Sequence, residues 1–241
     1  MNESIWIGFD QREAAAYAVA RSSIRRRLSH HIPIYGLVQD DLRSLGLYRR
    51  EVEKRKSAVD GDITWDIISD AAESTQFSNT RFLTKHLARK GWALFLDCDV
   101  LARADVVELF NLADDRFAVM CVKHNFMPLN TLKMDGQVQS QYERKNWSSV
   151  HLINCDHPSN RHLTIEMINE MPGRDLHRFC WLSDSEIGEL QPEWNFLVRH
   201  HVPRLIDPKI VHFTAGVPSM RGYENDPFAN EWREELNRWA S

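Results

Sequence analysis

The segment GWALFLDCDVL, residues 91–101, decides the fold class and also points to a functional site. It opens with the apolar run from Trp92 to Leu96, which fits a strand buried in a core. Asp97 and Asp99 follow at once, with Cys98 between them. Because a buried carboxylate without a partner is costly, we expect the strand to end at Leu96 and to present both carboxylates at the edge of a sheet.

Strand and helix patterns alternate in the residues that precede this segment. Residues 4–10 predict a short strand that ends at Asp10, residues 13–28 carry apolar side chains at helical spacing, and residues 32–37 predict a second strand. Such a strand–helix–strand order indicates a parallel sheet. The polar and charged residues 40–62 predict loop and short helix.

The remainder of the chain continues the alternating pattern and predicts one compact α/β domain over residues 1–241. Expected strands cover residues 117–122, 150–154 and 209–213, and expected helices cover residues 80–90, 106–110, 160–171 and 228–239. The polar residues 123–146 predict a loop that closes over a site, with Met127-Pro128 and Gly136 as hinges.

Composition fits a soluble globular protein and disfavours a dedicated nucleic-acid binder. The chain has 241 residues, 43% hydrophobic and 27% charged, with a net charge of −4. Its four cysteines are scattered, and it shows neither a signal peptide nor an apolar run long enough to span a membrane. We therefore expect a cytoplasmic location, with peripheral attachment at the inner face of the membrane left open. The clusters Arg25–Arg27 and Arg49-Arg50 fit either solvated helix faces or a patch for an anionic acceptor or membrane.

The spacing of the two aspartates suits a divalent cation. Residues two apart in an extended chain point the same way, so Asp97 and Asp99 can converge on one Mg²⁺ or Mn²⁺ ion that clamps a diphosphate. An Asp-X-Asp at a strand end also arises from capping and turn formation. The stretch KIVHFTAGVP, residues 209–218, offers His212 as a third ligand and Gly216 for close approach to a phosphate, although a lone histidine is more often structural.

The sequence resembles the nucleotide-sugar transferases of the GT-A fold and is similar to glycosyltransferase family 8 and related bacterial transferases. The resemblance rests on LFLDCDVL and VHFTAGVP, and on four further stretches in the family's order. These are IWIGFDQREAAAYAV (5–19), ESTQFSNTRFL (73–83), RKNWSSVHLIN (144–154) and LHRFCWLSDSEIGELQPEWNFLV (176–198). Together they extend over nearly the whole chain.

The resemblance implies a single GT-A-type, Rossmann-like domain with a mostly parallel central sheet flanked by helices. Residues 1–122 would form its nucleotide-sugar half and residues 123–241 its acceptor and sugar half. It also implies a role for each matched residue. Asp97, Asp99 and His212 would hold Mn²⁺ or Mg²⁺, and Phe9 and Asp10 would meet the nucleobase and ribose. Arg81 and Ser148 would lie near the donor sugar or its phosphates, and Asp184 would bind sugar hydroxyls close to the reacting carbon. Trp194 and Asn195 would help shape the acceptor side.

The activity implied is metal-dependent transfer of a sugar from a nucleoside diphosphate sugar, with uridine diphosphate sugars first, to a glycan or other hydroxyl acceptor. A lipid-linked or surface polysaccharide is one such acceptor. If the reaction inverts, Asp184 or Glu186 is the candidate base; if it retains, the diphosphate itself could take the proton. Where family 8 usually has Gln, this chain has Ser185, and the lysine often found after the His-Gly turn is absent.

Other interpretations of the same residues stay open. Asp10 and Asp184 could be caps, Arg81 a surface residue of a helix, and Trp194 a core aromatic. A nucleotidyltransferase would also use carboxylates and a metal, but the first strand here is followed by Asp10-Gln11-Arg12-Glu13, which lacks glycine. A carbohydrate-binding relative without catalysis, and a transferase acting on nucleic acid, are further alternatives.

Overall fold

The computed structural model describes residues 3–57, 61–124 and 144–240 of the chain. A six-stranded sheet forms its centre, in the order β10-β8-β9-β6-β1-β2. Its strands are β1 (Glu3–Gly8), β2 (Ile34–Leu37), β6 (Trp92–Leu96), β8 (Val119–Cys121), β9 (Val150–Asn154) and β10 (Ile187–Glu189). Most of the predicted loop 123–146, including Met127-Pro128 and Gly136, lies outside the described residues.

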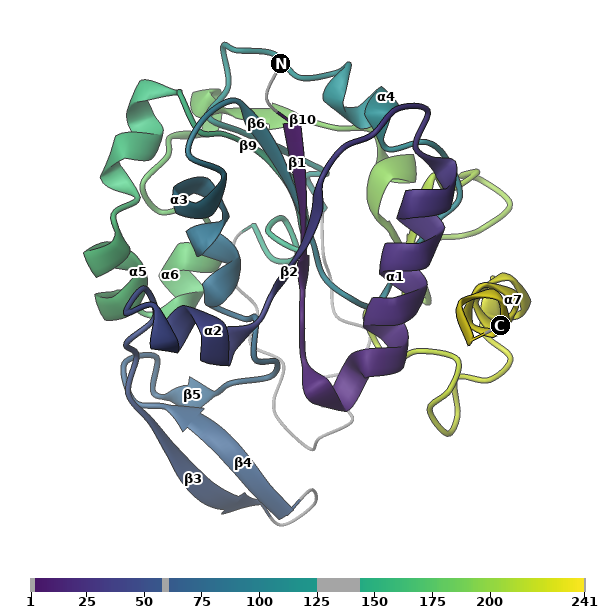
Figure 1. Cartoon of the computed structure of the whole chain (residues 1–241), viewed down its shortest axis with the longest axis horizontal. Helices are drawn as coiled ribbons and strands as arrows, with labels where there is room; N and C mark the ends of the chain where they lie inside the picture. The colour runs from purple at the N-terminus through teal and green to yellow at the C-terminus, as the bar shows by residue number, and fades with distance from the viewer. Residues whose placement is uncertain (1–2, 58–60, 125–143, 241) are drawn as a thin grey trace.

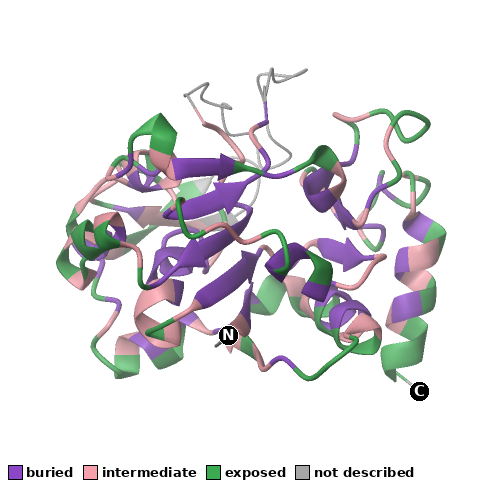
Figure 2. Cartoon of the chain, turned by 90° about the horizontal axis from the view of Figure 1, so that it is seen from above, coloured by how far each residue is buried: buried purple, intermediate pink, exposed green. Residues whose placement is uncertain are grey.

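The pairing within this sheet confirms a mixed α/β fold with a mostly parallel sheet. Strand β1 is parallel to β2 and β6, and β10 is parallel to β8, whereas β9 is antiparallel to both β6 and β8. All five residues of β6 are buried because the strand lies between β1 and β9 with both faces covered. Figure 2 shows these buried strands in the middle of the molecule, with more exposed helices on either side.

Helices cover both faces of the sheet. α1 (Ala14–Arg27) lies on one side, with α7 (Ala229–Ala240) beyond it, and α3, α5 and α6 lie on the other side (Figure 1). The shorter helices are α2 (Gln39–Ser44), α3 (Thr84–Ala88), α4 (Val107–Phe110), α5 (Ile165–Glu170) and α6 (Gly173–His177). Single 3-10 turns are η1 (Gln11–Glu13), η2 (Thr80–Leu83), η3 (Pro158–His162), η4 (Asp184–Glu186) and η5 (Pro192–Asn195). No helix among the described residues combines the length and the apolar character needed to cross a bilayer.

The basic cluster at the end of α1 serves the packing of α7. Glu235 of α7 is buried, and Arg26 Nη2 lies 2.8 Å from its Oε2 while Ser22 donates to its Oε1 at 2.8 Å. Arg27 adds a second ion pair at 3.6 Å. These contacts satisfy a buried carboxylate, so two of the three arginines are occupied within the fold.

The prediction of loop and short helix over residues 40–62 is wrong in part. The chain forms α2 there, but then an antiparallel hairpin of β3 (Val52–Ser57) and β4 (Gly61–Asp66), which pairs with β5 (Ala71–Ala72). The hairpin projects from the main body (Figure 1). Its charged sequence hides the strand pattern because an exposed two-stranded hairpin has no buried face to impose alternation.

A buried ion pair joins this hairpin to the rest of the protein. Arg50 is 1% exposed, and its Nε donates to Asp66 Oδ2 at 3.1 Å. Its Nη1 donates to the carbonyls of Ile168 and Met171 at 2.9 and 2.7 Å. Arg50 therefore belongs to the core, contrary to the solvated helix face that its charge suggested.

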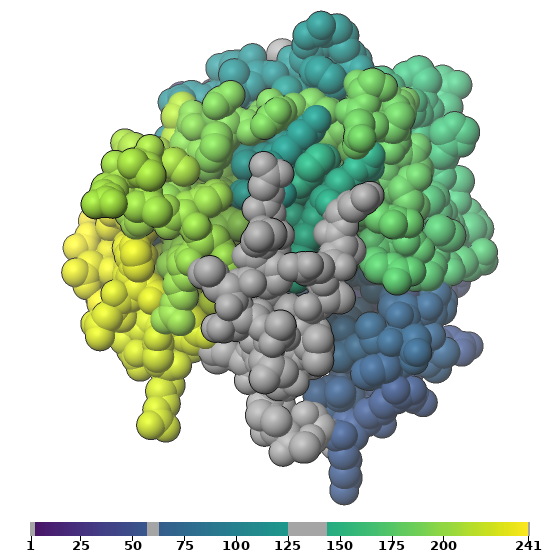
Figure 3. Space-filling model, turned by 180° about the vertical axis from the view of Figure 1, so that it is seen from behind, coloured from purple at the N-terminus to yellow at the C-terminus, as the bar shows by residue number. Residues whose placement is uncertain are grey.

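On the face of the molecule that is turned away from the viewer in Figure 1, segments of the C-terminal half lie on both sides. In Figure 3, green and yellow segments from this half lie on either side of teal segments from the middle of the chain. A second, three-stranded sheet in the order β11-β12-β7 is built from β11 (Phe196–Leu197), β12 (Ile210–His212) and β7 (Val100–Ala102). It connects the C-terminal half to the segment that follows the two aspartates.

Candidate metal and nucleotide-sugar site

Strand pairing brings the two aspartates and the distant histidine together. The Asp97 N–H donates to the Ser149 carbonyl at 2.9 Å, which fixes the chain where β6 ends. Strand β7 begins directly after Asp99 and pairs antiparallel with β12, so that His212 is the register partner of Val100. The Phe213 N–H then donates to the Asp99 carbonyl at 2.9 Å. Asp99 and His212, which are more than one hundred residues apart in sequence, thus lie side by side at one end of the main sheet.

The three side chains form a cation site of hard and borderline ligands. One ligand atom from each of Asp97, Asp99 and His212 can be chosen so that all lie within 4.8 Å of one another. Asp97 Oδ1 and Asp99 Oδ1 are buried, and each lies beside one cationic or ionisable group, Arg81 for the first and His212 for the second. Two such oxygens with an imidazole nitrogen fit Mn²⁺ or Mg²⁺, which favour oxygen ligands. These residues are the ones that the sequence predicted as metal ligands.

Charged neighbours flank both aspartates. Arg81 Nη1 lies 2.8 Å from Asp97 Oδ1, and His212 Nε2 lies 3.1 Å from Asp99 Oδ1. Arg81 is buried, and it also donates to the carbonyls of Ser78 and Ser148, both at 3.0 Å. The surface-helix interpretation of Arg81 is therefore wrong, because its guanidinium is held beside the first aspartate.

Burial and mutual repulsion separate the pKa values of the two carboxyls. Burial raises the pKa of Asp97 to about 6, a shift that the charge of Asp99 increases and that of Arg81 opposes. For Asp99, burial is outweighed by the charge and hydrogen bond of His212, which lower its pKa. The Asp99 carboxylate in turn raises the pKa of His212 against the effect of burial. A divalent cation would replace protons at this site, because its ligands must be deprotonated.

Trp194 and Asn195 are adjacent buried residues of η5. Lys209 Nζ lies 4.6 Å from the Trp194 ring centroid. Trp194 is thus a core aromatic. Asn195 Oδ1 lies 2.9 Å from His212 Nδ1, on the side of the ring away from Asp99. The structure therefore gives Asn195 a contact with a candidate metal ligand, and the predicted acceptor-side role stays a prediction.

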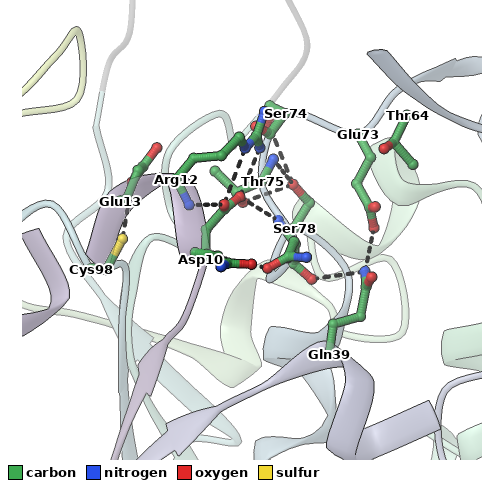
Figure 4. Close-up of polar contacts among 12 residues, drawn as sticks. Asp10, Arg12, Glu13, Gln39, Thr64, Glu73, Ser74, Thr75, Ser78 and Cys98 are labelled. Carbon is green, nitrogen blue, oxygen red and sulfur yellow. Dashed lines mark hydrogen bonds and ion pairs between the residues drawn. The ribbon is translucent and has the colours of Figure 1, made fainter. Parts of the chain in front are cut away.

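Glu13 is a carboxyl at the site that the sequence analysis missed as a functional residue. It directly precedes α1, and Cys98 Sγ donates to its Oε2 at 3.0 Å (Figure 4). Burial raises the pKa of Glu13 to about 7, with a further contribution from the charge of Asp99. Cys98 is buried, as its place between the two aspartates predicted, but its partner is this acid and not apolar packing alone. No motif marked Glu13, because its importance depends on α1 starting beside the end of β6.

Both carboxylate oxygens of Asp10, at the end of β1, accept hydrogen bonds from the protein. Its Oδ1 accepts from the Arg12 backbone N–H at 2.9 Å and its Oδ2 accepts from the Gln76 N–H at 3.0 Å. Arg12 Nη2 adds an ion pair at 2.7 Å and also donates to the Ser74 carbonyl (Figure 4). Asp10 is therefore the N-cap of η1 and joins β1 to residues 74–76. Contact with a nucleobase or ribose stays a prediction for Asp10, as it does for the half-buried Phe9 beside it.

Ser148 and Gly216 lie in ordered turns near the ligands. The Ser148 carbonyl accepts from Arg81, and its Oγ lies 2.7 Å from His177 Nδ1. The Gly216 N–H already donates to the Phe213 carbonyl at 2.9 Å, and a Cβ at this position would lie 2.8 Å from the Tyr223 ring. Gly216 is thus required by packing on Tyr223, and its phosphate contact stays a prediction.

The two predicted catalytic carboxylates have different surroundings. Asp184 is exposed and pairs with Arg144, whose Nη2 lies 2.5 Å from its Oδ1. Glu186 completes a capping box with Ser183 and accepts a hydrogen bond from Ser159. These hydrogen bonds from Ser159 and Ser183 lower the pKa of Glu186 to about 2, which makes it a weak base.

Strand register also separates Glu186 from the metal ligands. The Ala118 N–H donates to the Glu186 carbonyl, the Asn154 N–H donates to the Ala118 carbonyl, and Asn154 is the register partner of Trp92. Asp97 lies five residues beyond Trp92, which is about 16 Å along the strand direction. The backbone of Glu186 therefore lies toward the other end of the sheet; Asp184 belongs to the same turn, η4, and the base roles suggested for the two residues stay predictions.

Comparison with known proteins identifies a relative over nearly the full chain. The sequence is 43% identical over 242 residues to Protein CDI of Arabidopsis thaliana, with 98% of this chain and 86% of that protein covered. The chain belongs to the Protein CDI family. No family model matches the chain.

Solved structures show that this family has the GT-A glycosyltransferase fold. The galactosyltransferase LgtC, solved with donor and acceptor sugar analogues, superposes with a TM-score of 0.60 and 14% identity, covering 99% of this chain and 96% of that one. The glycosyltransferase GlyE of Streptococcus pneumoniae TIGR4 gives a TM-score of 0.60 and 14% identity, covering 99% and 64%. The bifunctional WbbM gives 0.61 and 15%, covering 97% and 49%, so this chain spans about half of WbbM. These matches confirm the predicted fold, and at such identities they carry no further conclusion.

Proposed function

We propose that this member of the Protein CDI family is a glycosyltransferase that moves a sugar from a nucleoside diphosphate sugar to a hydroxyl acceptor. The donor would be bound with Mn²⁺ or Mg²⁺ on Asp97, Asp99 and His212, and a uridine diphosphate sugar is the first candidate. The acceptor would be a glycan or another hydroxyl compound. One observation carries the proposal: buried carboxylate oxygens of Asp97 and Asp99 converge with the His212 imidazole in a GT-A fold.

The ligand set suits the departure of a diphosphate. When bound, a divalent cation would offset the negative charge that develops on the leaving diphosphate. Asp97 and Asp99 would hold it through one oxygen each, and His212 through Nε2. Arg81, 2.8 Å from Asp97, adds a fixed positive charge that limits repulsion between the carboxylates.

The chain offers Asp184, and not Glu186, as the candidate to accept the proton of the acceptor hydroxyl. Asp184 is exposed and pairs with Arg144, whereas Glu186 is committed to a cap. If the transfer retains configuration, no protein base is required, because the departing diphosphate can take the proton. Comparing Asp184→Asn with wild type distinguishes the two cases: loss of transfer with donor hydrolysis retained indicates a base.

A screen of nucleoside diphosphate sugars tests the proposal. We expect the full chain to hydrolyse at least one uridine diphosphate sugar slowly in the presence of Mn²⁺, and to stop when the metal is chelated. Asp99→Asn should lose this hydrolysis, whereas Asp114→Asn, which breaks a surface pair with Arg116, should not. Absence of metal-dependent turnover across the screen, with a folded protein, would contradict the proposed activity.

A further inference from the structure

We propose that Asn195 is a positioning residue that keeps a proton on His212 Nδ1 and so directs Nε2 at the candidate cation site. It does so at the end of a chain of hydrogen bonds that begins at the Asn146 carbonyl and passes through Ser149. The consequence for metal binding rests on the proposed function, but the proton on Nδ1 does not. The sequence suggested an acceptor-side role for Asn195 and gave no role to Ser149.

The first link fixes the direction of the Ser149 hydroxyl. Ser149 Oγ lies 2.8 Å from the Asn146 carbonyl oxygen and donates its proton there, because a carbonyl oxygen can only accept. Asn195 Nδ2 donates to Ser149 Oγ at 3.0 Å. Since the serine proton is already committed to Asn146, Ser149 can only accept from Asn195.

The second link fixes the orientation of the Asn195 amide. With its NH₂ group directed at Ser149, its Oδ1 faces His212 Nδ1 at 2.9 Å. A flipped amide would place Oδ1 against a serine oxygen with no proton to give, so the network selects one of the two orientations. Oδ1 is an acceptor, and His212 Nδ1 must therefore carry the proton.

The third link is the other nitrogen of the ring. With Nδ1 held by Asn195, Nε2 is the ring nitrogen left to face the site: without metal it can donate to Asp99, and a bound cation would displace that proton and take the Nε2 lone pair. Nε2 lies 3.1 Å from Asp99 Oδ1, within the candidate cation site. The chain of hydrogen bonds from Asn146 through Ser149 and Asn195, here called the relay, therefore directs Nε2, the nitrogen that can bind a metal, at the site.

Burial strengthens the hydrogen bonds of the relay. Asn195 is fully buried, and Ser149 and His212 are 4% and 2% exposed, so water has little access to replace a broken link. Asn146 has a φ of 63°, in the left-handed region that asparagine tolerates better than most residues. The Asn146 carbonyl, at which the relay begins, therefore lies in a turn.

The proton on Nδ1 can be detected in the metal-free protein. We expect ¹⁵N NMR of the His212 ring to show a protonated Nδ1. The His212→Gln variant assigns the signals. Ser149→Ala should weaken this preference for a proton on Nδ1, and Asn195→Leu should remove it. A wild-type ring with an unprotonated Nδ1 would overturn the proposal.

Metal affinity provides the second readout, with Mn²⁺ alone as the probe. Loss of a residue that orients a metal ligand typically weakens binding by about 10- to 100-fold, and we expect this loss in Asn195→Leu by calorimetric titration. Asn195→Asp, which keeps an oxygen toward Nδ1, should restore most of the affinity.

The matched control is Asn160→Leu. It removes an equally buried asparagine whose Nδ2 donates to the Ala118 and Asn154 carbonyls, away from the cation site. Unchanged Mn²⁺ affinity in folded Asn195→Leu would refute the positioning role. If wild type shows the expected proton on Nδ1 but binds no Mn²⁺, the relay stands and the proposed metal function fails.

Discussion

Glu13 offers a quantitative test of the electrostatics at the candidate site. Burial and the nearby Asp99 carboxylate raise its pKa to about 7, against 4.5 for an ordinary glutamate. Because the folded protein holds this proton more tightly than the unfolded chain, stability falls as the pH rises between these two values. At about 1.4 kcal/mol per pKa unit, the cost of the ionised group at neutral pH has an upper bound of about 3 kcal/mol.

Glu13→Gln removes that cost because an amide cannot ionise. In chelator, urea denaturation should show the variant more stable than wild type by about 1 to 3 kcal/mol at about pH 8, with little difference at about pH 5. Glu166→Gln, at a side chain that is 64% exposed, should show no such pH dependence. Equal stability differences for Glu13→Gln at both pH values would refute the reasoning. Excess Mn²⁺ should reduce the advantage at the higher pH, because a bound cation offsets the repulsion.

Two further predictions follow from buried charges. Arg50→Met leaves the Asp66 carboxylate buried without its cation and should lower the free energy of unfolding by about 3 to 5 kcal/mol, measured by urea denaturation; a loss below about 1 kcal/mol would mean that the pair contributes little. Since the pKa of Asp97 is raised to about 6, Mn²⁺ affinity should fall by up to tenfold per pH unit below that value. Calorimetric titration between about pH 5 and pH 8 measures this, and a flat profile would contradict the assigned ligand.

Local sequence was sufficient for the centre of the fold and for the metal ligands. The apolar run before Asp97 identifies β6 because a strand covered on both faces needs continuous hydrophobic residues. Asp97 and Asp99 could be paired from their spacing, although they lie in a bend between β6 and β7 and not in an extended strand. His212 could be suggested from the strand that carries it, but its place beside Asp99 is set by the pairing of β12 with β7.

The features that the sequence missed depend on contacts between distant elements. The β3–β4 hairpin has no buried face to reveal it, and Arg50 could not be recognised as buried until Asp66 was seen beside it. Glu13 and Ser149 lie in no motif that stood out, yet one faces Cys98 and the other orients Asn195. Glu186 was suggested as a candidate base, and its commitment to a cap and to Ser159 becomes visible only in the structure.

The account rests on one claim, that Asp97, Asp99 and His212 together bind a divalent cation for a nucleoside diphosphate. Crystals grown with Mn²⁺ and uridine diphosphate, measured at the manganese absorption edge, test it most directly. We predict an anomalous peak at about 2.0 to 2.4 Å from one oxygen of each aspartate and from His212 Nε2, with the diphosphate bound to the same ion. A diphosphate bound without metal at this site, or manganese bound elsewhere, would contradict the claim.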